Sequence, residues 1–150
     1  MAVKNYSASS AAFAQKNNLL VISISGHLVQ ADGQAMGHDS YVRMQRSGLL
    51  AALIDFKRSD VALSADITIR NLDALAALDR SLFKPSAFVV AARDLGYYRE
   101  IAWRMASLGM VAAAFTDGTD AANFAVRKGE VWQAELRFRR AQAAPALQCY

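Results

Sequence analysis

Cysteine, proline and histidine are scarce in this sequence, with one, two and two residues respectively among 150. A single thiol, Cys149, excludes an internal disulfide and a cysteine-based metal cluster. Neither Pro85 nor Pro145 lies in a Gly-, Ser- or Pro-rich linker, and the sequence contains no repeat. We therefore expect one domain over residues 1–129, followed by a C-terminal extension, residues 130–150, that is partly flexible.

Long apolar runs and a strong excess of charge are also missing. The longest apolar runs, 48–54 and 109–115, are far shorter than the roughly 20 residues that cross a bilayer. Residues 1–15 lack the apolar segment of a secretory leader. Seventeen Lys and Arg against 13 Asp and Glu give a net charge of only +4, without a clustered basic face. We expect a soluble cytoplasmic protein that binds no nucleic acid and is not an integral membrane protein.

Apolar runs of strand length alternate with stretches of helical spacing, and 54% of the residues are hydrophobic, which is enough for a buried core. The expected strands are 6–14, which turns at 16–18 into a hairpin, and then 19–25, 50–56, 87–92 and 110–115. The expected helices are 32–46, 65–83, 95–108 and a last helix from Thr116 or Asp117 that ends before Gly129, with a loop at 57–63. The order β-β-α-β-α-β-α-β-α predicts an α/β domain with a mixed, mostly parallel sheet, because parallel crossovers need a covering helix.

Residues that favour helix ends support these boundaries. Asp32 and Ser64 are placed to accept hydrogen bonds from the first N–H groups of their helices, and Asp117 is placed to do the same for the last helix. Gly48 can adopt the left-handed backbone that often ends a helix, as expected for the helix before it.

Several apolar stretches of this chain are similar to those of a known family. They are LVISISG at 20–26, ALIDF at 52–56, AFVVAA at 87–92, GMVAAAFTD at 109–117 and AANFAV at 121–126. Together they span about residues 19–128 and resemble the STAS-like domains, and among these the bacterial SpoIIAA-like branch, also called STAS/SEC14-type. The resemblance implies a STAS-like fold. The antagonists of this family carry a phosphorylatable serine in an Asp-Ser-x-Gly motif, which is absent here, and Ser59 and Ser64 are the serines nearest to its position.

Charged and hydroxyl residues follow the expected parallel strands, at the edge where ligands bind in open α/β sheets. The candidate ligand- or partner-binding residues are Asp55, Lys57, Arg58, Ser59, Ser64, Arg93 and Asp117. Helix N-termini attract anions, so one interpretation is a site for a small anion or phosphate-bearing ligand. The other is that the acidic residues cap helices while the basic ones form solvated ion pairs, and capping is the commoner use.

Metal, nucleotide and nucleophile motifs are absent. His27 and His38 do not have the spacing of a zinc site, and Gly33 and Gly37 lack the lysine and serine of a phosphate-binding loop. No Gly-x-Ser-x-Gly elbow surrounds a serine. We therefore expect no enzyme, no cofactor and no metal.

The sequence thus predicts a non-catalytic STAS-like binding or regulatory module that recognises a protein partner or a small ligand through residues 59–66 and the helix that follows. The alternative is a carrier of, or an enzyme for, an anion or lipid-like ligand, using the edge around Asp55, Arg93 and Asp117. A third interpretation is self-association as a homodimer, through the aromatic and basic residues 97–104 or through the basic tail at residues 137–140.

Overall fold

The N-terminal part of the chain forms three antiparallel strands. The computed structural model describes residues 1–45, 48–61, 63–77 and 84–148, and its first elements are β1 (Ala2–Asn5), β2 (Ser9–Lys16) and β3 (Leu19–Leu28). Asn17 and Asn18 both have positive φ, 53° and 61°, which a two-residue turn between twisted strands requires. The predicted hairpin is confirmed. The additional strand, β1, was not predicted because all of its residues are exposed and it therefore has no apolar alternation.

The rest of the sheet is parallel. β4 (Ala51–Val61), β5 (Ser86–Val89) and β6 (Ala112–Phe115) complete a six-stranded sheet whose strand order follows the chain, β1-β2-β3-β4-β5-β6. Between these strands run α1 (Gln30–Met44), α2 (Ala65–Ala76) and, after the short 3₁₀ turn η2 (Ala92–Asp94), α3 (Leu95–Ser107). The predicted α/β class and the mixed sheet are confirmed.

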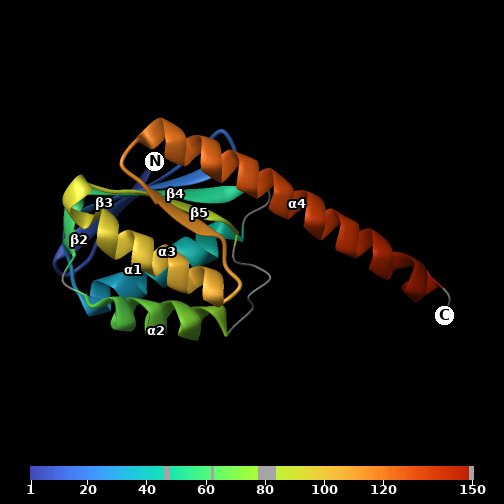
Figure 1. Cartoon of the computed structure of the whole chain (residues 1–150), viewed down its shortest axis with the longest axis horizontal. Helices are drawn as coiled ribbons and strands as arrows, with labels where there is room; N and C mark the ends of the chain where they lie inside the picture. The colour runs from blue at the N-terminus through green and yellow to red at the C-terminus, as the bar shows by residue number, and fades with distance from the viewer. Residues whose placement is uncertain (46–47, 62, 78–83, 149–150) are drawn as a thin grey trace.

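The helices cover the two faces of the sheet unequally (Figure 1). α1, α2 and α3 lie side by side on one face, where α2 contacts both of its neighbours. The opposite face is covered by α4 (Gly118–Gln148), which contacts β4, β5 and β6 and then extends well beyond the sheet.

Small side chains let α4 lie close to the sheet. Ala121 and Ala125 are fully buried against Ala51 and Ala87. At Gly129 the approach is closer still, since a Cβ atom there would lie 2.7 Å from Leu50 Cβ and 2.8 Å from the Leu50 carbonyl oxygen. The prediction that this helix ends before Gly129 is therefore wrong. Gly129 lies in the interior of α4, where the absence of a side chain lets the helix pack closely against the start of β4.

Two other predicted boundaries are also wrong. Residues 57–61, expected in a loop, continue β4, and they pair with β3 beyond the point where β5 has ended. This extension has exposed Lys57, Arg58 and Asp60 beside buried Ser59, so it lacks the continuous apolar run that was used to place the strand. α1 begins at Gln30, so Asp32 lies inside its first turn and does not cap it. α1 ends at Met44, close to the predicted end, and Gly48 has the left-handed backbone that was predicted, with a φ of +86°.

The helix expected over 65–83 begins as predicted and ends at Ala76. Its expected last part falls on residues 78–83, which lie outside the described residues. α3 ends at Ser107, one residue before its predicted end, and Gly109 just beyond it has a φ of +83°, which matches a left-handed helix end.

A glycine-to-alanine change at Gly129 tests the close approach of α4. We expect Gly129→Ala to lower the free energy of unfolding by about 1–3 kcal/mol through overpacking, because the opposing Leu50 carbonyl belongs to the backbone and cannot rotate away. This loss outweighs the gain of about 1 kcal/mol in helix propensity. Urea unfolding measures the change.

Gly118→Ala, at the start of the same helix, is the matched control, because a Cβ atom there meets nothing within 4 Å. We expect it to be neutral or stabilising. Equal effects of the two substitutions would contradict the close packing of α4 on β4.

Candidate functional site

The predicted residues on β4 are held by contacts within the strand. The Asp55 carboxylate accepts a hydrogen bond from the Lys57 backbone N–H at 2.9 Å. Ser59 is only 2% exposed, and its hydroxyl donates to the Phe56 carbonyl at 2.9 Å. Lys57 and Arg58 are exposed. A buried serine engaged by the backbone is poorly placed for modification, whereas the two basic residues are free to meet solvent.

The remaining predicted residues lie at helix starts or in ion pairs. The Ser64 hydroxyl accepts from the Ile67 N–H at 3.2 Å, and Asp117 accepts from the N–H groups of Thr119 and Asp120 at 2.8 and 2.9 Å. Capping by these two residues is confirmed. Arg93 lies 3.5 Å from Asp60 and 3.6 Å from Asp94, both measured between guanidinium nitrogen and carboxylate oxygen.

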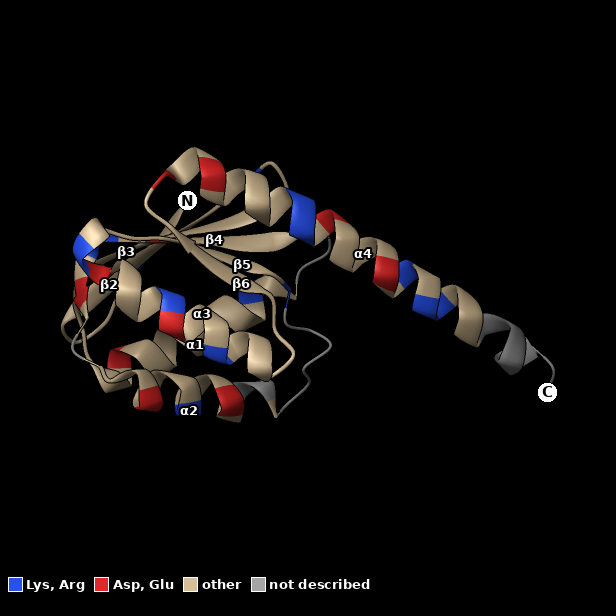
Figure 2. Ribbon diagram, in the orientation of Figure 1, with Lys and Arg blue, Asp and Glu red and all other residues tan. Residues whose placement is uncertain are grey.

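The structure does not join these residues into one polar cluster. Within the described ranges, no hydrogen bond or ion pair connects Asp55, Arg93 and Asp117. Figure 2 shows charges of both signs spread along α2, α3 and α4. Ligand binding at this edge of the sheet stays a prediction.

A buried carboxylate that was predicted only as a cap, that of Asp32, accepts hydrogen bonds at the start of α1. Asp32 is 3% exposed and accepts four hydrogen bonds, from the N–H and hydroxyl of Ser7, the Ala8 N–H and the Ser9 hydroxyl, at 2.6–3.1 Å. These bonds, the one from the Ser7 hydroxyl above all, lower the pKa of Asp32 from 3.8 to about 2. Asp32 thus ties the β1–β2 turn to α1.

A partly enclosed cavity of about 190 Å³ lies between the sheet and α1–α3. Its floor is formed by apolar side chains of β3, β4 and β5, including Ile22, Ile54 and Phe88, and its wall is almost entirely apolar. Gly33 and Gly37, one turn apart in α1, also line it. At Gly33 a Cβ atom would lie 3.3 Å from a Leu63 methyl, so α1 and Leu63 pack closely there, and Gly37 adds no side chain to the cavity one turn further on.

Aromatic rings of α3 close the cavity at the carboxyl ends of the strands. Tyr98 stacks on Phe56 with ring centroids 4.4 Å apart, and Tyr97 meets Tyr98 edge-on at 5.0 Å. The Tyr98 hydroxyl is buried and has no hydrogen-bond partner in the described part of the chain. Burial raises the pKa of Tyr98, so this hydroxyl is neutral.

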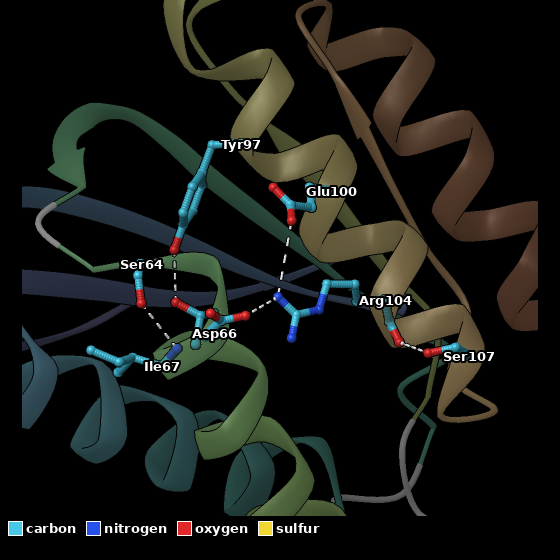
Figure 3. A network of polar contacts seen from close by, with 8 residues as sticks. Ser64, Asp66, Ile67, Tyr97, Glu100, Arg104 and Ser107 are labelled. Carbon is cyan, nitrogen blue, oxygen red and sulfur yellow. Dashed lines mark hydrogen bonds and ion pairs between the residues drawn. The ribbon is translucent and has the colours of Figure 1, made fainter.

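Polar contacts hold α2 to α3 over this cavity (Figure 3). The Arg104 guanidinium lies 2.7 Å from the Asp66 carboxylate and 4.0 Å from that of Glu100. The hydroxyls of Thr68 and Tyr97, both in the cavity wall, are hydrogen-bonded at 2.7 Å. These contacts stabilise the position of α2 on the outer side of the cavity.

One cation lies at the other end of the cavity. Lys84 lines it just before β5, and its ammonium donates to the Leu49 carbonyl at 2.6 Å and lies 5.6 Å from the centre of the Trp132 ring in α4. Lys84 is half-buried, and burial lowers its pKa. Sequence reasoning missed both the cavity and Lys84, because neither corresponds to a motif. The Gly33–Gly37 spacing was the only signal.

Comparison with known proteins identifies the fold. No protein-family model and no curated protein matches this chain. A crystal structure of an uncharacterized protein from the DUF3478 family, with a SpoIIAA-like fold and from Shewanella loihica PV-4, is similar. It is 18% identical, the alignment covers 81% of this chain and 96% of that chain, and the TM-score is 0.50. This protein is therefore an α/β domain with a SpoIIAA-like fold, as the resemblance in sequence implied.

A membrane-spanning helix and a cluster of side chains able to bind a metal ion are both absent from the described residues. No helix in the described residues combines the length and the hydropathy that crossing a bilayer demands. The same residues contain no group of three or more His, Cys, Asp or Glu side chains that would hold a metal ion.

The role of Asp32 is testable by acid titration. Because its pKa is depressed in the folded state, its stabilising contribution is complete above about pH 4 and disappears as the pH falls through about 2. We expect Asp32→Asn to lower the melting temperature by several degrees at pH 7. The difference from the wild type should shrink toward pH 2. Circular dichroism across this pH range measures it.

Asp60→Asn is the control, since Asp60 is exposed and paired only loosely with Arg93. We expect it to change the free energy of unfolding by less than about 1 kcal/mol. If the two variants were equally stable at pH 7, the hydrogen bonds of Asp32 would not stabilise the β1–β2 turn on α1.

Proposed function

We propose that this protein is a non-catalytic binding module that holds a small apolar ligand in the cavity between the sheet and α1–α3. The cavity itself is the observation that carries the proposal. Protein interiors normally contain few voids larger than a water molecule. A cavity of about 190 Å³ is much larger than that, so the apolar side chains around it lack packing partners on one side. A ligand of fitting shape would supply these contacts.

The composition of the wall supports binding over catalysis. General acid–base chemistry uses His, Asp, Glu, Lys, Tyr or Cys groups placed together at a reacting centre. Among the described residues that line the cavity there is no His, Asp, Glu or Cys. The lining groups of the types named are Lys84, Tyr41, Tyr97 and Tyr98, and Lys84 and Tyr98 lie toward opposite ends of the cavity. The hydroxyls of Thr68 and Tyr97 are hydrogen-bonded to each other, and that of Ser40 donates to the Met36 carbonyl.

A cavity-filling substitution tests this proposal. Gly37 faces the cavity, so Gly37→Leu should fill it and abolish binding of a neutral aliphatic probe, 1-octanol. The same change should raise the stability of the ligand-free protein, through burial and through about 0.8–1.0 kcal/mol of helix propensity. The readout is the shift in melting temperature that 1-octanol causes in each variant.

Gly96→Leu is the matched control, because Gly96 lies in α3 and a Cβ atom there meets nothing within 4 Å. The wild type and Gly96→Leu should show equal stabilisation by 1-octanol, and Gly37→Leu should show none. No stabilisation of the wild type, or an undiminished one in Gly37→Leu, would overturn the proposal.

Protein binding is the second candidate function, favoured by the exposure of large side chains. Trp103 on α3 is 74% exposed, and Phe138 on the extended part of α4 is 64% exposed. Aromatic and arginine residues are enriched in protein interfaces, and Arg99 precedes Trp103 by one turn. Light scattering would support self-association if it gave a mass above 16.3 kDa that falls with Trp103→Ala.

Recognition of a ligand around Asp55, Arg93 and Asp117 is the other alternative function.

A further inference from the structure

We propose that the ligand of this cavity is a small aliphatic carboxylate, whose chain occupies the apolar space and whose carboxylate pairs with the Lys84 ammonium. This inference rests on the proposed function and adds the chemical class of the ligand and its orientation.

The cavity is apolar at one end and cationic at the other. The parallel strands run from Lys84, just before β5, toward Phe56 and the tyrosines at the start of α3. α1 and α3 return in the opposite direction, which brings Met44 and Met105 to the Lys84 end. A ligand lying along the cavity therefore has a polar group available at one end and ring faces and aliphatic groups at the other.

Lys84 has unused capacity to bind an anion. An ammonium carries three donors, and the one hydrogen bond it makes here goes to the neutral Leu49 carbonyl. In the described ranges, no carboxylate lies within ion-pair distance of it. A half-buried cation without a counter-ion is costly, and a ligand carboxylate would both neutralise it and satisfy its remaining donors. Burial lowers the pKa of Lys84, and a bound carboxylate would raise it again.

The size of the cavity restricts the ligand to small molecules. Typical pockets for drug-sized ligands span roughly 300–1,000 Å³, whereas this cavity has about 190 Å³. A carboxylate with a short or medium aliphatic chain fits this space, and a two-chain lipid does not.

The contact between Lys84 and Trp132 provides a local signal. Trp132 lies where α4 passes the edge of the sheet, close to Gly129, and its ring is 5.6 Å from the Lys84 ammonium. A carboxylate bound to Lys84 changes the charge next to this ring. In a Trp103→Phe background, Trp132 is the remaining tryptophan, so its fluorescence reports on that end of the cavity.

The experiment compares octanoate with 1-octanol, which has the same chain and a neutral head group. We expect the wild type to bind octanoate about tenfold or more tightly than 1-octanol by calorimetry, with a change in Trp132 fluorescence. Lys84→Met should reduce octanoate affinity to that of 1-octanol and leave 1-octanol binding unchanged. Lys84→Arg should retain most of the preference, and Lys128→Met, at an exposed lysine of α4, should retain all of it.

The outcomes separate the two proposals. If 1-octanol binds and octanoate binds no more tightly, the inference about the carboxylate is wrong and the proposed function stands. If octanoate is preferred and Lys84→Met leaves that preference intact, the assignment of Lys84 is wrong. If neither probe binds, both the inference and the proposed function fall.

Discussion

Neighbouring parallel strands that follow one another along the chain place α1, α2 and α3 on the same face of the sheet. This constraint determines the rest of the molecule. Three helices side by side must close over a twisted sheet, and α1 presents Gly33 and Gly37 toward it. The space they leave is bridged from outside by the Arg104–Asp66 pair, which holds α3 to α2 (Figure 3). The opposite face has one helix, whose alanines and Gly129 close it tightly.

The two faces therefore have different physical roles. On the α4 side, the side chains are small and the backbone of α4 approaches the sheet closely, so little space is left for a ligand. On the other side, large residues such as Phe56, Phe88 and Tyr98 contact each other through their rings yet leave a hollow beside them. The Lys84 ammonium lies 5.6 Å from the centre of the Trp132 ring in α4, so the ligand that we propose for one face would contact a residue that itself touches the helix covering the other.

The fold was largely predictable because β5, β6 and the first parts of β3 and β4 are rich in apolar residues and because two helices have clear caps at Ser64 and Asp117. The errors arose where a residue type had two uses. Gly129 was interpreted as a helix end although it permits a close approach, and Asp32 was interpreted as a cap although it accepts hydrogen bonds from another turn. The cavity was not predictable, since it results from the spacing of three helices that are distant in sequence. The edge residues were selected by strand position, and most of them are engaged with their own backbone or with near neighbours.

The most direct test of ligand binding in the cavity is a methionine-methyl NMR titration with 1-octanol. Met36, Met44 and Met105 line the cavity, Met110 is buried in the same core without lining it, and Met1 is exposed, so Met1 is an internal control. We expect the methyl signals of the three lining methionines to shift with ligand and saturate together, while that of Met1 stays in place and that of Met110 shifts less. Unchanged signals for the lining methionines, or equal shifts in all five, would contradict binding between the sheet and α1–α3.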